Sequence, residues 1–201
     1  MSADQTELGE LLAFAVSLAR DAGEITLKYF QRSPKTETKV DGSFVTVADR
    51  EAEAYLRRTI SDRFPNDGIL GEEAGEHQGS SGRRWIVDPI DGTFSFVHGV
   101  PLYGVLIALE IDGEPLIGVI NIPALNEIVY AAHGVGCFSK GESARVSSNC
   151  YARRGPPVGD GLWSLSAIWF WCSRRSVAGP GKSAAHVGRL LRTRAGRDGP
   201  R

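Results

Sequence analysis

Residues 85–93, Trp-Ile-Val-Asp-Pro-Ile-Asp-Gly-Thr, constrain the fold more than any other stretch of the chain. The apolar residues before Asp88 are typical of a buried strand. Because Pro89 has no N–H to give to a strand ladder, we expect the chain to leave the sheet there. Asp88 and Asp91 would then project from the rim of the strand into a loop. This stretch therefore predicts a buried strand that ends in two closely spaced acids.

Carboxylates held this close repel each other unless a cation lies between them, and oxygen-rich sites of this kind suit Mg²⁺. Gly92 and Thr93, which follow, offer backbone N–H groups to an anion. A second acidic pair, Glu72 and Glu73, follows the short apolar run 69–70, so two strand ends can bring acids to one sheet edge. A cation site beside an anion-binding turn is what phosphate chemistry needs. The alternative is a strand followed by an Asp-Pro turn whose acids are simply solvated.

Two stretches on the N-terminal side have helical periodicity. The apolar stripe over 8–22 predicts an amphipathic helix that continues to about residue 30. Thr46 and Asp49 have the spacing of a capping box, and a second apolar stripe runs from there to residue 64. Asp49 would lie in the first turn of this helix, where a carboxylate is favoured.

The chain after Thr93 is typical of a short helical turn followed by an antiparallel meander. An Asp-Gly pair between two apolar runs is a strong hairpin signal. Two helices and such a sheet predict an α+β fold in which the helices pack on an antiparallel sheet. The helical turn is expected at 94–97, the apolar runs lie at 102–111, 116–120 and 127–132, and the polar stretches 35–45 and 74–82 are interpreted as loops.

Length and composition limit the class of protein. The chain has 201 residues, of which 42% are hydrophobic, enough for one core or for one and a half small domains. No stretch approaches the roughly 20 apolar residues of a membrane span, and the acidic N-terminus is not that of a secretory signal. Cys137, Cys150 and Cys172 have neither metal-site spacing nor an even number. We therefore expect reduced thiols in a cytoplasmic protein without a membrane partner.

Charge is distributed unevenly along the chain. Residues 1–150 carry 22 acidic and 13 basic side chains, whereas residues 151–201 carry 2 and 10. A basic segment of this kind can serve as a nucleic-acid arm. However, it combines nine arginines with three of the four tryptophans and shows no periodicity, as a shifted reading frame would. We expect residues 1–147 to form one domain and residues 148–201 to be an atypical, disordered basic tail without a nucleic-acid partner.

Three motifs together resemble the inositol monophosphatase superfamily: Gly-Glu-Glu at 71–73, the stretch 85–93, and Phe-Ser-Phe-Val-His-Gly-Val-Pro at 94–101. The resemblance runs from the N-terminal helix to about residue 147. It implies the N-terminal half of that family's layered α/β sandwich, with the C-terminal domain missing. The family's Trp-Asp-x-Ala metal motif does not occur after Thr93. The resemblance also implies Mg²⁺-dependent hydrolysis of a small phosphate monoester, and a homodimer for the intact family member.

The resemblance assigns the metal ligands residue by residue. It implies that Glu72, Asp88, the carbonyl of Ile90 and Asp91 bind Mg²⁺. Lys39 matches a lysine that the family carries on a loop near the metals.

The same resemblance assigns the catalytic and substrate-binding residues. Asp49 is expected to hydrogen-bond Thr93, which then orients a metal-activated water toward phosphorus. The N–H groups of Gly92 and Thr93 are expected to hold the phosphate, and Glu72 is assigned to the substrate as well as to the metal.

Residues 42–53 and 104–109 look most similar to the histidinol-phosphate phosphatases of this superfamily. Histidinol phosphate is therefore the favoured small phosphorylated alcohol, and inositol monophosphate is the second choice. Two other functions stay open. One is a catalytically impaired, truncated fragment that only binds metal, phosphate or a partner, and the other is a nucleic-acid binder that uses the basic tail.

Overall fold

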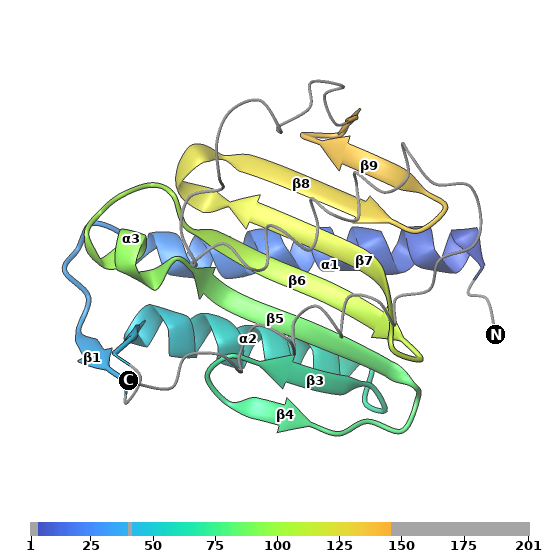
Figure 1. The fold of residues 1–201 in the computed structure, drawn as a ribbon, viewed down its shortest axis with the longest axis horizontal. Coiled ribbons are helices and arrows are strands. Elements are labelled where there is room, and N and C mark those ends of the chain that lie inside the picture. Colours follow the sequence, from blue (N-terminus) through green and yellow to red (C-terminus); the bar gives the residue numbers. More distant parts are fainter. Residues whose placement is uncertain (1–3, 40–41, 146–201) are drawn as a thin grey trace, which may run out of the picture.

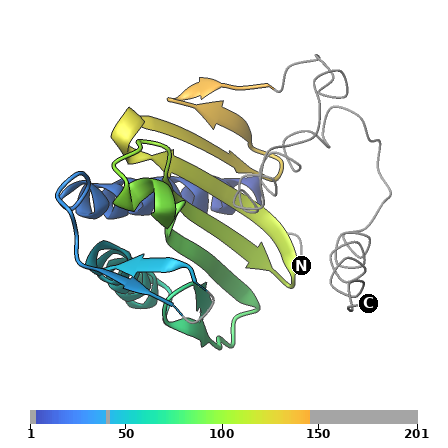
Figure 2. The same ribbon diagram turned by 60° about the vertical axis from the view of Figure 1, so that its left-hand side comes forward.

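The computed structural model describes residues 4–39 and 42–145 (Figures 1 and 2). The expected tail at 148–201 and the domain boundary before it lie outside these residues. Both long helices lie on the same face of an eight-stranded sheet, so the predicted α+β architecture of helices on a sheet is confirmed. Within the described ranges, no helix is long and apolar enough to cross a membrane.

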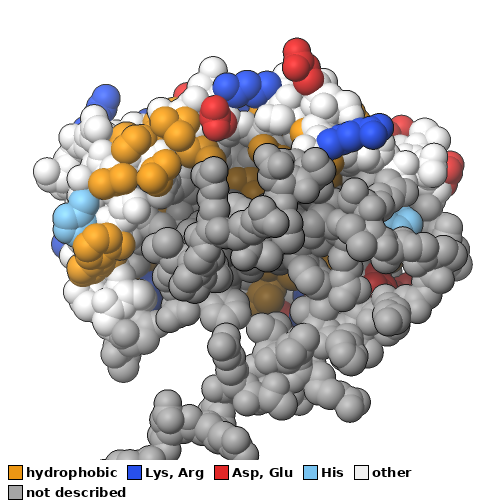
Figure 3. All heavy atoms as spheres, turned by 45° about the horizontal axis from the view of Figure 1, so that its top comes forward, with side chains coloured by type: hydrophobic (Ala, Val, Ile, Leu, Met, Phe, Trp, Pro, Cys, Tyr) orange, Lys and Arg blue, Asp and Glu red, His pale blue; other side chains and the backbone are white. Residues whose placement is uncertain are grey.

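The surface of the described residues mixes both signs of charge on the face drawn in Figure 3. Basic and acidic side chains lie singly among uncharged ones, and hydrophobic side chains gather toward one side. The visible, described part of this face therefore presents no basic patch.

The two helices form where the apolar stripes predict them. Helix α1 (Gln5–Leu27) ends three residues earlier than expected, and the chain continues in turns until Gln31 adopts a positive φ of 58°. Helix α2 (Val47–Arg63) begins at the predicted capping box. There Thr46 Oγ1 accepts a 3.1 Å bond from Ala48 N–H, and Asp49 Oδ2 accepts a 2.8 Å bond from Thr46 N–H.

Strand β5 (Arg83–Asp91) is central to the site because its two neighbours run in opposite directions. It pairs antiparallel with β6 (Gly104–Ile111) and parallel with β3 (Gly68–Gly71). The prediction of a wholly antiparallel sheet is therefore wrong at one pair. Between β3 and β5 the short strand β4 (Gly75–His77) carries the chain back to the end where β3 began, so β5 repeats the direction of β3.

The remaining strands confirm the meander and correct two predicted loops. The sheet order is β10-β9-β8-β7-β6-β5-β3-β4, and all strands beyond β6 are antiparallel. Strand β4 and a separate two-stranded sheet formed by β1 and β2 lie in stretches interpreted as loops, because three-residue strands are too short to show alternation. The bounds are β1 Thr36–Thr38, β2 Phe44–Thr46, β7 Glu114–Ile122, β8 Glu127–Ala132, β9 Gly136–Ser139 and β10 Glu142–Ser143, with a 3₁₀ turn at Pro123–Leu125.

The sequence predicted that the chain leaves the sheet at Pro89, and this prediction is wrong. Strand β5 continues to Asp91, which lies opposite Gly104. The pairing with β6 instead shifts register between Asp88 and Asp91. A shift of this kind accommodates a proline, which cannot donate to the ladder.

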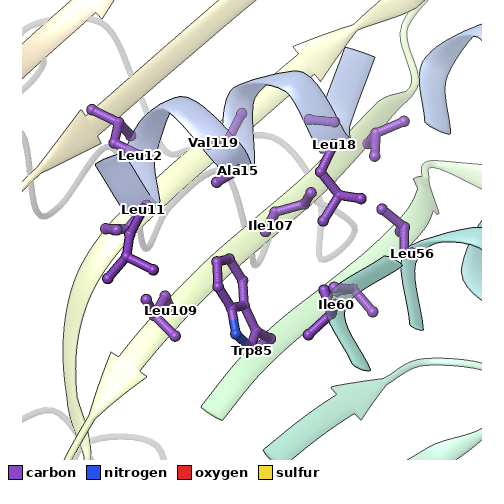
Figure 4. Close-up of a cluster of buried hydrophobic side chains, with 14 of the residues drawn as sticks. Leu11, Leu12, Ala15, Leu18, Leu56, Ile60, Trp85, Ile107, Leu109 and Val119 are labelled. Atoms are coloured by element: carbon purple, nitrogen blue, oxygen red, sulfur yellow. The ribbon is translucent and has the colours of Figure 1, made fainter. Parts of the chain in front are cut away.

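Trp85 at the centre of β5 joins the sheet to both helices (Figure 4). Its side chain is fully buried, and the rings of Phe14 and Phe64 lie 5.6 and 5.7 Å from it. Removing a buried ring of this size costs about 3–5 kcal/mol. This packing holds β5 in place and thereby fixes where its terminal acids emerge. The surrounding apolar side chains include Leu11, Leu12, Ala15 and Leu18 of α1, Leu56 and Ile60 of α2, and Ile107, Leu109 and Val119 of the sheet.

Candidate functional site

The acids of the two motifs come to one edge of the sheet because β3 and β5 are parallel neighbours. Gly71, the last residue of β3, lies opposite Val87 of β5. Glu72 and Glu73 therefore leave β3 at the same edge where Asp88 stands on β5. Burial and, after it, the neighbouring carboxylates of Glu72 and Asp91 together raise the pKa of Asp88 to about 8.

These oxygen donors suit Mg²⁺ by their chemistry. Burial is the largest cause of the raised pKa of Asp88, and the like charges of Glu72 and Asp91 come after it. Within residues 4–39 and 42–145, however, no three His, Cys, Asp or Glu side chains stand close enough together to hold an ion. Glu72, Asp88 and Asp91 thus offer the type of oxygen donor that Mg²⁺ prefers, and their side chains would have to move closer together to bind it.

Lys39 supplies positive charge to the acids that follow β3. Its Nζ donates to Glu72 Oε1 at 3.0 Å and to Glu73 Oε1 at 2.6 Å. Partial burial lowers the pKa of Lys39, but the hydrogen bonds and charges of the two glutamates outweigh burial and raise that pKa above its ordinary value. The loop lysine expected near the acids therefore contacts two of them directly.

Asp49 and Thr93 lie next to each other, as the resemblance implied. Thr93 Oγ1 stands 3.0 Å from the carbonyl oxygen of Ile90 and 3.4 Å from Asp49 Oδ1. One hydroxyl hydrogen serves one acceptor at a time, and the shorter contact is the better bond. Burial raises the pKa of Asp49, while the hydrogen bonds from Thr46 oppose the rise. The contact exists in the structure, and the catalytic role of the pair stays a prediction.

Gly92 shapes the turn between the acids and the short helix α3 (Thr93–Val97). Its φ of 90° lies in the left-handed region, and a Cβ would stand 3.2 Å from the carbonyl oxygen of Leu102. The N–H groups of the first turn of a helix have no partner within that helix. Gly92 and Thr93 therefore lie where the predicted phosphate turn requires them, although the phosphate role itself stays a prediction.

Sequence reasoning missed Glu53, whose carboxylate contacts the turn after β3. The side chain is 2% exposed and accepts bonds from the N–H groups of Glu73 at 2.7 Å and Ala74 at 3.0 Å. The signal was available, because position 53 lies on the same helical stripe as Leu56 and Ile60. A charged residue on a core-facing stripe requires buried partners.

A cavity of about 200 Å³ lies at the opposite end of β5, away from these residues. Its lining includes Arg84 and Glu110, which form an ion pair at 2.6 Å. Arg83, also in the lining, pairs with buried Asp67 at 3.0 Å. Because these arginines already have partners, we interpret the cavity as structural.

Residues 7–164 match the model of the inositol monophosphatase family. The chain belongs to the inositol monophosphatase family. The resemblance carried by the three sequence motifs is thereby confirmed.

Two relatives within this family are named histidinol-phosphatase. That of Chlorobaculum parvum is 54% identical over 138 residues, which cover 68% of this chain and 53% of the relative. That of Mycobacterium tuberculosis is 45% identical over 135 residues, which cover 67% and 52%. The solved structure of a Thermotoga maritima IMPase matches with a TM-score of 0.66 and 39% identity over 70% of this chain and 55% of that one. The chain thus spans about half the length of the curated relatives it matches.

Proposed function

We propose that this chain carries the metal- and phosphate-binding half of the active site of a Mg²⁺-dependent phosphatase acting on a small phosphate monoester. The observation that carries the proposal is the environment of Asp88. Its pKa is raised to about 8 by burial and by the carboxylates of Glu72 and Asp91, beside the turn at Gly92. Perturbed carboxylates of this kind gather where a cation is needed.

Glu72, Asp88, Asp91 and the carbonyl of Ile90 are the proposed ligands of Mg²⁺. The bound ion would supply positive charge to the phosphoryl oxygens and would activate water. Family membership supports this assignment, because the family is in general Mg²⁺-dependent. The chain itself contributes a rigid edge, since β3 and β5 are fixed by their pairing and by the core beneath them.

The turn at Gly92 and the hydroxyl of Thr93 are proposed to hold and orient the reactants. The N–H groups of Gly92 and Thr93 bind the phosphate oxygens, and Thr93 Oγ1 accepts a hydrogen bond from the attacking water. The hydroxyl hydrogen can point to Asp49 or to the carbonyl of Ile90, which leaves a lone pair of Thr93 Oγ1 for the water. Catalysis then consists of positioning and charge neutralisation, with no covalent enzyme intermediate.

Histidinol phosphate is the proposed substrate, and inositol monophosphate is the second choice. The names of the two histidinol-phosphatase relatives support this order, and an inositol monophosphatase of Dictyostelium discoideum, 38% identical over 145 residues, supports the alternative. We propose a cytoplasmic setting for the reaction, in keeping with the expected reduced thiols.

The decisive test combines Mg²⁺ binding with phosphate release. Calorimetry should detect Mg²⁺ binding to the 201-residue chain and its loss in Asp91→Asn. Asp62→Asn, at an exposed position of α2, is the matched control and should bind Mg²⁺ as the original chain does. Equal binding in Asp91→Asn would refute the metal site, and phosphate release from histidinol phosphate but not from inositol monophosphate would decide the substrate.

The impaired-fragment function stays a second candidate because the chain spans about half of its relatives. Mg²⁺ binding without turnover of either substrate would select it. The nucleic-acid alternative depends on residues 151–201, which lie outside the described residues. DNA retention that is sensitive to salt and vanishes on deletion of residues 151–201 would revive it.

A further inference from the structure

Glu53 is a buried acid that is fully engaged by the turn after β3. Its Oε2 accepts from Glu73 N–H at 2.7 Å, and its Oε1 accepts from Ala74 N–H at 3.0 Å. Arg57, one turn later on α2, donates from Nε to the same Oε1 at 2.8 Å. Three donors therefore satisfy one carboxylate that is 2% exposed.

Arg57 contacts the same turn a second time, at its far side. Its Nη2 donates to the carbonyl oxygen of Gly75, the first residue of β4. The pair of Glu53 and Arg57 thus binds two N–H groups and one carbonyl of a single turn. A turn held at both ends by one helix has little freedom to shift.

Gly71 lets the turn come this close to α2. A Cβ at this position would overlap Glu53 Oε1 and stand 2.6 Å from Glu53 Cδ and 2.7 Å from Arg57 Nη2. Any larger residue would push the carboxylate away from the turn. The glycine before the glutamate pair and the acid of α2 therefore fit one another.

The side chain of Glu72 is 42% exposed, so packing around it does little to fix its position. Its position therefore depends on the backbone that carries it. The backbone on its C-terminal side is fixed by Glu53, and the backbone on its N-terminal side is fixed by β3. The direction in which Glu72 leaves the sheet edge is therefore set by β3 on one side and by Glu53 on the other.

We propose that Glu53, assisted by Arg57, is a positioning residue that presents Glu72 to the metal site. Glu53 does not touch the metal or the substrate. Its effect on the ion passes through the turn, as outer partners of metal ligands act in general. This inference rests on the proposed function, because it takes Glu72 to be a ligand.

The test compares Glu53→Gln with Asp67→Asn in the full 201-residue chain. Asp67 is the matched control, since it is also a buried acid with an arginine partner but lies at the other end of β3. Glutamine keeps the size of Glu53, but one carboxylate oxygen becomes an NH₂ donor that faces a backbone N–H, either that of Glu73 or that of Ala74. Glu53→Gln should raise the Kd for Mg²⁺, measured by calorimetry on folded protein, by about 10-fold or more. Asp67→Asn should leave that Kd unchanged.

Amide hydrogen exchange gives a second readout that needs no metal. The amides of Glu73 and Ala74 should exchange faster in Glu53→Gln and at the original rate in Asp67→Asn. Unchanged exchange at both amides in Glu53→Gln overturns the proposal. An equal rise of the Mg²⁺ Kd in both variants also overturns it, because the effect would then follow stability alone.

Two further variants separate the inference from the proposed function. If Glu72→Gln leaves Mg²⁺ binding intact, the proposed ligand set fails and the inference fails with it. If Glu72→Gln weakens binding and Glu53→Gln does not, the positioning role alone is wrong. Should Glu53→Gln not fold, Arg57→Met replaces it, and an unchanged Kd in that variant overturns the proposal.

Discussion

Asp67, just before β3, and Asp88, on β5, are two acids near opposite ends of neighbouring strands, and the fold surrounds them in opposite ways. Asp67 accepts hydrogen bonds from Ser81 at 2.7 Å, Arg83 at 3.0 Å and Trp85 Nε1 at 2.9 Å. Asp88 accepts a bond from Ile90 N–H at 3.1 Å but has two further carboxylates as neighbours, and its pKa rises to about 8.

The difference separates a carboxylate whose charge is matched by protein donors from one that we propose as a metal ligand. The charge of Asp67 is matched from within by an arginine and an indole, so that end of the sheet is complete. Asp88 binds a proton in the folded chain at pH values where the unfolded chain has released it. Its ionisation therefore opposes folding near neutral pH. A fold retains such a cost where function requires it.

The largest expected effect comes from breaking the satisfied end. Asp67→Ala should lower the free energy of unfolding by about 3–5 kcal/mol, because it leaves the buried Trp85 Nε1 and the partly buried guanidinium of Arg83 without an acceptor. Urea denaturation followed by circular dichroism measures this loss. A loss no larger than that of a surface substitution would show that water replaces the carboxylate and reaches the donors of Arg83 and Trp85.

The next effect should have the opposite sign. Asp88→Asn removes one of the repelling charges. Without Mg²⁺, it should raise the free energy of unfolding by on the order of 1–3 kcal/mol. The same variant should lose the increase in Tm that Mg²⁺ gives to the original chain, which for a saturating ligand is a matter of mass action. Thermal unfolding with and without Mg²⁺ tests both parts. A destabilised Asp88→Asn would mean that Asp88 is as well satisfied as Asp67.

Much of the fold could be predicted because its signals are local. The apolar stripes gave α1 and α2, and the Thr46–Asp49 spacing gave the start of α2. The parallel pairing of β3 with β5 depends on β4, a strand of three exposed residues whose sequence has no alternation to detect. Long-range pairing that relies on such a strand leaves no local trace.

The sequence was enough to predict which acids meet at one edge of the sheet, but not which residues support them; their role as a site stays a prediction. Strand-end logic brought Glu72, Asp88 and Asp91 to one edge, and the edge is there in the structure. How far apart their side chains stand depends on rotamers and on the partner Lys39, which no spacing encodes. Glu53 was missed although its place on the apolar stripe of α2 indicated burial, and the sequence does not show which backbone groups it binds.

A moderate effect is expected from removing the partner of Asp49, Thr46. Like Asp67, Asp49 accepts hydrogen bonds from nearby donors, and like Asp88, it has a raised pKa. It is buried and hydrogen-bonded by Thr46 Oγ1 at 2.6 Å, yet burial raises its pKa. Thr46→Ala removes the cap of α2 and this bond, and should lower the free energy of unfolding by about 1–2 kcal/mol. Thr46→Ser keeps the hydroxyl and should retain most of the stability. Equal losses in the two variants, measured by urea denaturation, would show that the methyl group and not the cap carries the effect.

The smallest effect is expected at Glu37, an acid that is paired but not buried. Arg50 Nη1 donates to Glu37 Oε1 at 3.1 Å, and the two side chains are 53% and 50% exposed. The hydrogen bond from Arg50 and its charge lower the pKa of Glu37, so any stability from the pair would be present above the usual glutamate range and lost as pH falls. Because solvent screens exposed pairs, Glu37→Gln should leave the unfolding midpoint unchanged from neutral to acidic pH. A lower unfolding midpoint for Glu37→Gln at neutral pH, but not at low pH, would show that an exposed ion pair stabilises the fold without burial. The contrast between Asp67 and Asp88 would then follow from their partners and not from their burial.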